Sequence, residues 1–200
     1  MTGMVRKALI ITAGFAVVAS VASAGVPDPR NSTTDAVVVG GSSGTAIGAA
    51  PAGYDVVVRD VNNAPLAGRT VVLDFSATPM KVVQVQNAGT TVNCAAKTIS
   101  RVTNASGAVN FAGRIGKFDN TNGVEVSADG VVLANVRGRS TDISGDGTTN
   151  ILDLIPFALN YLSNPAAPET DYSGDNTTNI VDFISFSGEY LGAASGAVCP

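Results

Sequence analysis

Short stretches in which apolar and polar residues alternate dominate the chain between residues 54 and 136. Tyr54, Val56 and Val58 fall on one side of such an alternation, and residues 69–75 repeat the pattern. Because successive side chains of a strand point to opposite faces, these runs predict half-buried strands. The predicted strands are residues 54–60, 69–75, 81–86, 97–103, 108–111, 124–128 and 131–136. About seven short strands separated by turn residues favour a β-sandwich over a barrel.

The period of the pattern changes after residue 150. Apolar residues then recur at intervals of three and four, which is the spacing of one face of an α-helix. They are Ile151, Leu154, Ile155, Ala158, Leu159 and Leu162 in one stretch, and Ile180, Phe183, Ile184 and Leu191 in another. Pro165 is expected to end the first helix, and Pro156 to make it irregular, because proline removes a backbone donor. The expected fold class is mainly β with a small α module.

The first 24 residues have the layout of a secretory signal peptide. Arg6 and Lys7 precede an apolar run, and Ala24 closes a sequence of small residues suited to cleavage. The alternative is a retained membrane anchor, but the run is short for a span of ~20 residues. No later stretch is apolar enough to cross a bilayer. We therefore expect a secreted, extracellular protein, with attachment to the cell surface and no membrane span after cleavage.

The predicted organisation has four parts. Residues 1–24 are the signal peptide, and residues 25–50 are a flexible lead-in with room for a first strand. Residues 51–139 form the sandwich, and residues 140–200 form the helical module. A short linker is expected at residues 137–141.

Composition removes several classes of function. The chain contains no His and no Trp, which excludes His-based triads and metal sites that need imidazole. With 12 basic against 16 acidic residues, nucleic acid is not an expected partner. The carboxylates of the predicted sandwich are scattered over strands and turns without an evident acid–base pair. We expect a protein that is not an enzyme and assign no catalytic residue.

Charge is divided unevenly along the chain. Residues 25–139 carry 10 basic and 8 acidic residues, whereas residues 140–200 carry 8 acidic residues and no Lys or Arg. A compact segment with a net charge of −8 repels itself. A cation is therefore expected in its folded state.

The acidic segment contains an internal repeat. Residues 142–162 align with residues 171–191, and 13 of the 21 aligned positions are identical. Oxygen-bearing side chains recur at loop positions 1, 3, 5, 9 and 12, with Gly147 or Asn176 at the turn position 6. This is the spacing of an EF-hand-type calcium loop. The alternative is a pair of Asx-rich turns that cap helices and bind nothing.

Calcium takes six to eight oxygen ligands, and each loop offers a matching set. The predicted ligands of the first loop are Asp142, Ser144, Asp146, the carbonyl of Thr148, Asn150 (directly or through water) and Asp153. Those of the second loop are Asp171, Ser173, Asp175, the carbonyl of Thr177, Asn179 and Asp182. We predict two bound calcium ions, Ca2+, and folding that is coupled to their binding.

Cys94 and Cys199 are the two cysteines of the chain. In an oxidising compartment an even number of cysteines indicates a disulfide, which would tie the C-terminus to the predicted sandwich. Two unpaired thiols or a bond between two chains are the alternatives.

A calcium loop followed by one helix, twice and without an entering helix, resembles the dockerin type I repeat pair over residues 142–191. The resemblance implies two calcium loop–helix (F-hand) motifs that pack together and dock onto a cohesin-type domain of another protein. It assigns partner choice to loop positions 10 and 11, which are Ile151, Leu152, Ile180 and Val181. Ser at position 3, Thr at position 8 and Asn176 depart from the family's pattern, and the Ser implies weaker calcium sites.

Residues 60–68 and 103–111 resemble the bacterial Ig-like domain (group 1, invasin/intimin-type). The resemblance implies an immunoglobulin-like β-sandwich that serves as a spacer or an adhesive stalk. The leading hypothesis is a secreted calcium-binding protein whose dockerin-like module anchors this sandwich to a cohesin-bearing scaffold or cell-surface partner. One alternative is a structural or adhesive subunit that self-associates and in which calcium only rigidifies the module. Another is a carbohydrate-binding accessory module, which the absence of Trp disfavours.

Overall fold

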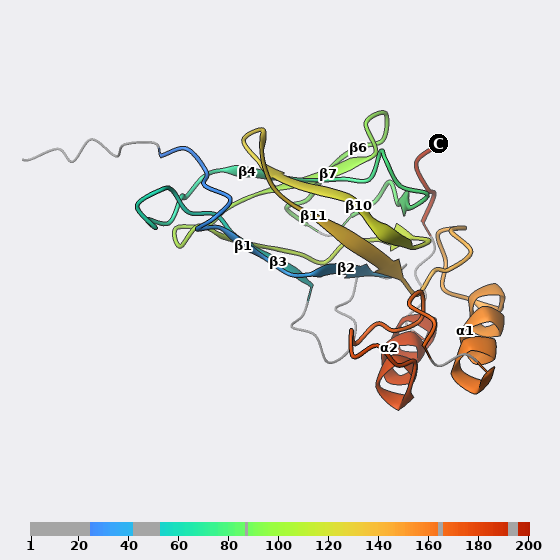
Figure 1. Ribbon diagram of the computed structural model, residues 1–200. Coiled ribbons are helices and arrows are strands. Elements are labelled where there is room, and N and C mark those ends of the chain that lie inside the picture. Colours follow the sequence, from blue (N-terminus) through green and yellow to red (C-terminus); the bar gives the residue numbers. More distant parts are fainter. Residues whose placement is uncertain (1–24, 42–52, 87, 164–165, 192–195) are drawn as a thin grey trace, which may run out of the picture.

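The computed structural model describes residues 25–41, 53–86, 88–163, 166–191 and 196–200. The predicted signal peptide and most of the second half of the lead-in lie outside these residues. The described chain is mainly β with a small helical part (Figure 1), as the pattern predicts. Its strands are β1 (Thr33–Thr34), β2 (Val37–Gly40), β3 (Tyr54–Val57), β4 (Thr70–Asp74), β5 (Lys81–Val82), β6 (Thr91–Asn93), β7 (Thr98–Val102), β8 (Ala108–Phe111), β9 (Ile115–Gly116), β10 (Asp119–Ala128) and β11 (Val131–Ser140). Its helices are α1 (Ile151–Ser163) and α2 (Ile180–Leu191).

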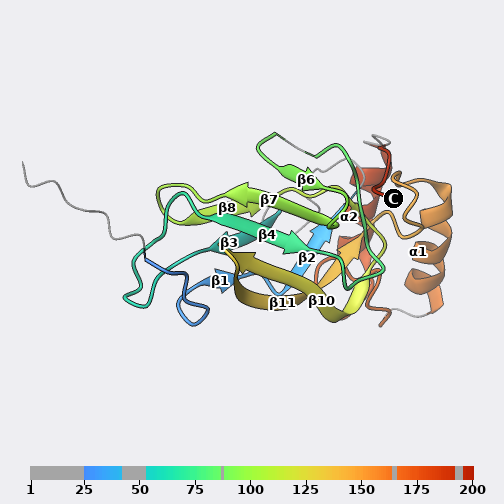
Figure 2. The same ribbon diagram turned by 90° about the horizontal axis from the view of Figure 1, so that it is seen from above.

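Two sheets pack against each other around one apolar core. A six-stranded sheet has the order β2-β11-β10-β4-β7-β6, and a three-stranded sheet has the order β1-β3-β8. A short pair, β5-β9, accompanies them. Val56 and Phe111 of the smaller sheet lie in one buried cluster with Leu73 and Val126 of the larger one. Seen from above, the helices lie at one end of these sheets (Figure 2).

The alternating pattern located most of the strands. Strand β8 has the predicted bounds, and β3, β4 and β7 lie inside their predicted ranges. The strand predicted at residues 81–86 is only two residues long in the structure, because Val83 and Gln84 pair outside the sheets with residues near the C-terminus. Strands β6 and β9 were missed, since two or three residues are too few to show a period.

Strands β10 and β11 are joined by a tight hairpin. Ala128 pairs with Val131, so Asp129 and Gly130 alone form the connection. Both have positive φ, 46° and 82°, which is the conformation of a type I′ turn. Asp and Gly are the residues that tolerate it best.

The predicted linker at residues 137–141 is wrong for residues 137–140. These residues extend strand β11, and Arg137–Ser140 pair in parallel with Val37–Gly40 of β2. Residues 37–40 are a continuous apolar run with no alternation, so the sequence showed only room for a strand there. Strand β11 therefore leads into the acidic repeat after a single residue, Thr141.

The two helices pack through a small aromatic core. Phe157 of α1, Phe186 of α2 and Tyr172 are each at most 2% exposed. The rings of Phe157 and Phe186 stack with their centroids 4.8 Å apart. Helix α1 is continuous through Pro156, so the expected irregularity is absent from the assigned helix. It ends at Ser163, directly before Asn164 and Pro165.

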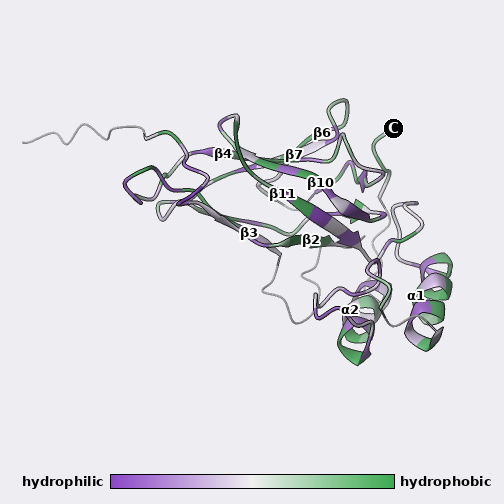
Figure 3. Ribbon diagram, in the orientation of Figure 1, coloured by the Kyte–Doolittle hydropathy of each residue, from purple (hydrophilic) through white to green (hydrophobic). Residues whose placement is uncertain are grey.

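Most of the apolar helical positions face outward rather than into this core. Each of these side chains is between 54% and 79% exposed: Ile151, Leu152, Ile155, Leu159, Leu162, Ile180 and Ile184. Hydrophobic segments are visible on both helices in Figure 3. Neither helix has the length and apolarity needed to cross a membrane, and this holds for all described residues.

Candidate metal centre

Loop one, residues 142–153, brings three carboxylates together immediately before and within the first turn of α1. Oxygen atoms of Asp142, Asp146 and Asp153 lie within 4.8 Å of one another. Asp142 and Asp153 are fully buried, whereas Asp146 is exposed. Three negative groups this close repel one another strongly when two of them are withdrawn from water. The arrangement has the geometry to hold a cation.

Backbone N–H groups surround the first of these carboxylates. Asp142 Oδ1 accepts hydrogen bonds from the N–H groups of Gly145 (2.7 Å) and Asp146 (3.2 Å), and Oδ2 accepts one from Gly147 (2.9 Å). Burial first, and then the charges of Asp153 and Asp146, nevertheless raise the pKa of Asp142 to about 6, although the Gly147 and Gly145 N–H groups act to lower it. The donors shape the loop and only partly offset the effect of burial on this carboxylate.

The last carboxylate is fixed by the loop's own backbone. Asp153 accepts hydrogen bonds from the N–H of Ser144 to Oδ1 (2.7 Å) and from the N–H of Asn150 to Oδ2 (2.8 Å). The Asp153 carboxylate, at loop position 12, therefore contacts the backbone of Ser144, at loop position 3. The Ser144 hydroxyl also lies in the cluster, where it donates to Asp142 Oδ1 at 3.2 Å.

Asn150 serves as the N-cap of α1. Its Oδ1 accepts from the N–H of Leu152 at 2.8 Å, which satisfies a donor of the first helical turn. Its Nδ2 turns toward the predicted ligands and donates to Asp146 Oδ2 (3.0 Å) and the Thr148 carbonyl (3.2 Å). The structure thus joins Asn150 to the cluster through its nitrogen, while its oxygen faces the helix.

Loop two, residues 171–182, repeats this network position by position. Oxygen atoms of Asp171, Asp175 and Asp182 lie within 4.8 Å of one another, again buried, exposed and buried. Asp182 accepts from the N–H groups of Ser173 (2.7 Å) and Asn179 (2.8 Å), as Asp153 does in loop one. Asn179 Oδ1 caps α2 through the N–H of Val181 at 2.8 Å, and its Nδ2 donates to Asp175 and to the Thr177 carbonyl.

The donor set of each loop suits a hard cation. Three carboxylates, a backbone carbonyl and a hydroxyl supply oxygen atoms only, which is the chemistry that calcium prefers. The spacing argument therefore identified clusters that the structure does assemble. The ion itself remains a prediction.

Sequence reasoning missed a positively charged side chain, Arg139, that reaches loop two from strand β11. The Arg139 guanidinium, at the end of β11, donates through Nη1 to the Asp171 carbonyl and lies 3.1 Å from Asp171 Oδ2. Arg139 is 1% exposed, and burial lowers its pKa, an effect that the charge of Asp171 opposes. No local pattern signals this contact, because 32 positions separate the two residues.

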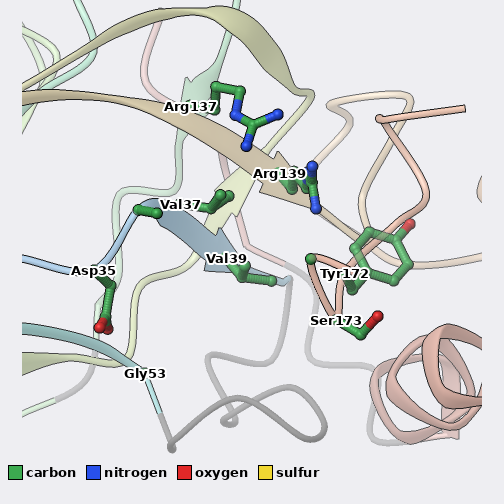
Figure 4. A pocket seen from close by; sticks show the side chains of 10 residues that line it. Asp35, Val37, Val39, Gly53, Arg137, Arg139, Tyr172 and Ser173 are labelled. Carbon is green, nitrogen blue, oxygen red and sulfur yellow. The ribbon is translucent and has the colours of Figure 1, made fainter. Parts of the chain in front are cut away.

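The same junction contains a cavity of about 270 Å³. Arg137 and Arg139 of β11 line it together with Tyr172 and Ser173 of loop two (Figure 4). Arg139 lies between strand β11 and the Tyr172 ring in this view. The helical module thus meets the sheets along a partly polar seam.

The predicted cysteine pair is present. Cys94 and Cys199 form a disulfide within the chain, and Cys199 is buried in the core of the sheets. Both cysteines are therefore accounted for.

The predicted partner-binding residues lie at the first turns of the helices. Ile151, Leu152 and Ile180 are more than half exposed, and Val181 is half-buried. Next to them an apolar groove of about 270 Å³ runs between the helices, lined by Leu154, Phe157, Ala158, Tyr161, Leu162, Ile180 and Phe183.

Comparison with known proteins gives no relative for this chain. No family model matches it. No curated protein and no solved structure matches it significantly either.

Proposed function

We propose that this chain is a secreted calcium-binding protein, not an enzyme, whose two loop–helix motifs attach it to a protein partner. The observation that carries the proposal is that the two carboxylate clusters directly adjoin two helices with exposed apolar side chains. Two all-oxygen carboxylate clusters stand at the N-termini of two helices, and these helices leave their apolar side chains in solvent.

Calcium is the ion that best fits the clusters. Each loop would bind it through its three aspartates and the carbonyl at position 7, with the Ser hydroxyl close by. A bound divalent ion would neutralise most of the repulsion among the aspartates and hold each loop against its helix. Two ions would reduce the net charge of residues 140–200 from −8 to −4.

The exposed helical surface supports docking. Exposed apolar side chains gathered on two short helices are typical of a surface that binds a partner. It lies in a segment without Lys or Arg, so a suitable partner offers an apolar patch bordered by basic residues. The resemblance to dockerins names a cohesin-type domain as that partner. Ile151, Leu152 and Ile180 are its proposed contacts, with Val181 behind them.

The sheets are then the part of the protein that the docking module holds in place. We propose an immunoglobulin-like sandwich that acts as a spacer or adhesive unit. The two packed sheets around one core support this assignment.

One observation favours a second candidate function. Both loops are tied to the sheets, loop one through the N–H of Lys117 to the Asp142 carbonyl (2.6 Å) and loop two through Arg139. In a structural or adhesive subunit, calcium would stiffen this joint, and the apolar helical face would pair with a second copy.

Calorimetric titration of the full chain with calcium, after removal of metal by a chelator, tests the metal proposal. We expect two ions per chain and a gain of helical circular dichroism. Asp146→Asn and Asp175→Asn are each expected to abolish one ion. Glu125→Gln removes the same charge from strand β10, outside both loops, and should leave two. A chain that binds no calcium, or a spectrum unchanged by chelator, would overturn the proposal.

Capture by immobilised cohesin domains separates the two candidates. Binding in calcium but not in chelator, weakened by Leu152→Asp, supports the docking role. Failure to bind any of a broad panel of cohesin domains, together with calcium-dependent dimers in analytical ultracentrifugation, supports the second candidate.

A further inference from the structure

The last five residues of the chain form a tail that lies between loop one and the sheets. The Cys199 N–H donates to the Val82 carbonyl (2.7 Å), and the Gln84 N–H donates to the Ala197 carbonyl (2.8 Å). Val198 forms an antiparallel bridge with Val83. The disulfide to Cys94 then fixes the end of this short pairing in the buried core.

The other end of the tail contacts loop one. The Gly196 N–H donates to the Gly147 carbonyl at 3.1 Å. The N–H of Gly147, in turn, donates to Asp142 Oδ2 at 2.9 Å. One residue of the loop therefore joins the tail to the first predicted calcium ligand.

Loop two offers a comparison. Its residue at position 6 also donates its N–H to the first aspartate of the loop, but among the described residues it makes no hydrogen bond to the tail. The N–H of Asn176 donates to Asp171 Oδ2 at 3.0 Å, and Asn176 has a positive φ of 68°. Its side chain is exposed. A Cβ at Gly147 would lie 2.1 Å from the Gly196 carbonyl oxygen, so contact with the tail admits only Gly there. This explains why the two repeats differ at the turn position.

We propose that the tail is a strap for loop one, so that the state of the Cys94–Cys199 disulfide and the calcium occupancy of loop one are linked. The inference rests on the proposed calcium binding. With the disulfide closed, Gly196 holds Gly147, and Gly147 holds the Asp142 carboxylate. With the disulfide open, the tail keeps only its short backbone pairing with residues 82–84, and loop one loses the covalent part of this support.

The linkage is reciprocal. If the closed disulfide strengthens calcium binding at loop one by some factor, calcium makes the disulfide harder to reduce by the same factor. Reduction by a dithiol breaks the S–S bond. The two protein sulfurs take up two electrons and two protons, and the dithiol becomes a cyclic disulfide.

The experiment measures calcium affinity loop by loop in the full chain. Asp175→Asn leaves loop one to be read alone, and Asp146→Asn leaves loop two. In each background the paired substitution C94S/C199S removes the disulfide. We expect the affinity of loop one to fall about fivefold or more, the lower range of site-to-site coupling, and that of loop two to change less than twofold. In the Asp175→Asn chain, calcium should raise the dithiol concentration at which half of the Cys94–Cys199 disulfide is reduced.

A second variant keeps the disulfide and serves if C94S/C199S fails to fold. Gly147→Asn places at loop one the residue that loop two tolerates at similar φ, but its Cβ meets the tail. It should weaken loop one while the disulfide is closed and have less effect when the disulfide is reduced. Gly130→Asn is the matched control, since Gly130 has positive φ and no atom within 4 Å of an added Cβ.

The possible results are distinct. Absence of calcium binding in every variant would refute the proposed function itself. Calcium binding at loop one that is indifferent to both the disulfide and Gly147→Asn would refute the strap alone.

Discussion

The sheets and the helical pair are stabilised in different ways. Among the described residues, 19 buried side chains form the core of the sheets, whereas three form the core of the helices. The helical pair compensates with polar ties, namely the loop networks, the Arg139–Asp171 ion pair and the tail. A domain too small to bury enough apolar surface generally needs a metal or a disulfide. The contrast shows that one chain can combine a region with a large apolar core and a region that depends on polar contacts.

The largest expected effect sharpens this contrast through the aromatic core. Phe157→Ala should lower the free energy of unfolding by about 3–5 kcal/mol, because it removes the ring that stacks on Phe186 and Tyr172. Since few other side chains are buried there, we expect the helices to unfold while the sheets persist. Leu73→Ala, in the core of the sheets, should cost about 2–5 kcal/mol and weaken the sheets instead. Urea unfolding in calcium, followed at 222 nm and at the β-sheet band, distinguishes the two. Identical loss of both signals in both variants would show a single cooperative unit.

A smaller effect is expected at the joint between the two regions. Arg139→Met leaves the buried Asp171 carboxylate without its cation, which should cost about 3 kcal/mol in chelator. Calcium in loop two would supply a replacement charge, so the cost should be lower when calcium is present. Arg137→Met, on the same strand but half-buried, is the control and should stay within about 0.5 kcal/mol. An equal cost for Arg139→Met with and without calcium would contradict a shared role at Asp171.

The smallest effect on stability is expected on the exposed helical face. Leu159 is 59% exposed, so Leu159→Ser should change the free energy of unfolding by less than about 0.5 kcal/mol. The same change should reduce capture by a cohesin-type partner, or dimerisation, because it removes apolar contact area. Thermal unfolding and the capture assay together provide the check. A loss of several degrees in Tm would mean that this face is packed in solution.

Local features were the ones that the sequence revealed. Each carboxylate cluster lies within twelve consecutive residues, so spacing alone identified Asp142, Asp146 and Asp153 as neighbours. Likewise, the alternation of Val71 and Leu73 placed strand β4 because each strand carries its own period.

Long-range features escaped because they depend on which segments meet. The parallel pairing of β2 with the end of β11 joins two segments about 100 positions apart, and residues 137–140 are strand rather than the expected linker. The Arg139–Asp171 contact depends on the same placement. The apolar stripe of α1 was correctly identified as helical, but periodicity cannot show which face of a helix has a partner. The role of Asn150 as a cap followed from the rotamer of its amide, which spacing does not determine.

The separation of charge between the two regions has a consequence for how this molecule meets others. The sheets carry a small positive excess and the helices, at one end, a large negative one. The molecule is an electric dipole whose negative pole also carries the exposed apolar side chains of the two helices. The field of a positively charged partner would orient the molecule so that the helices make the first contact. Added salt would screen this attraction and lower the association rate.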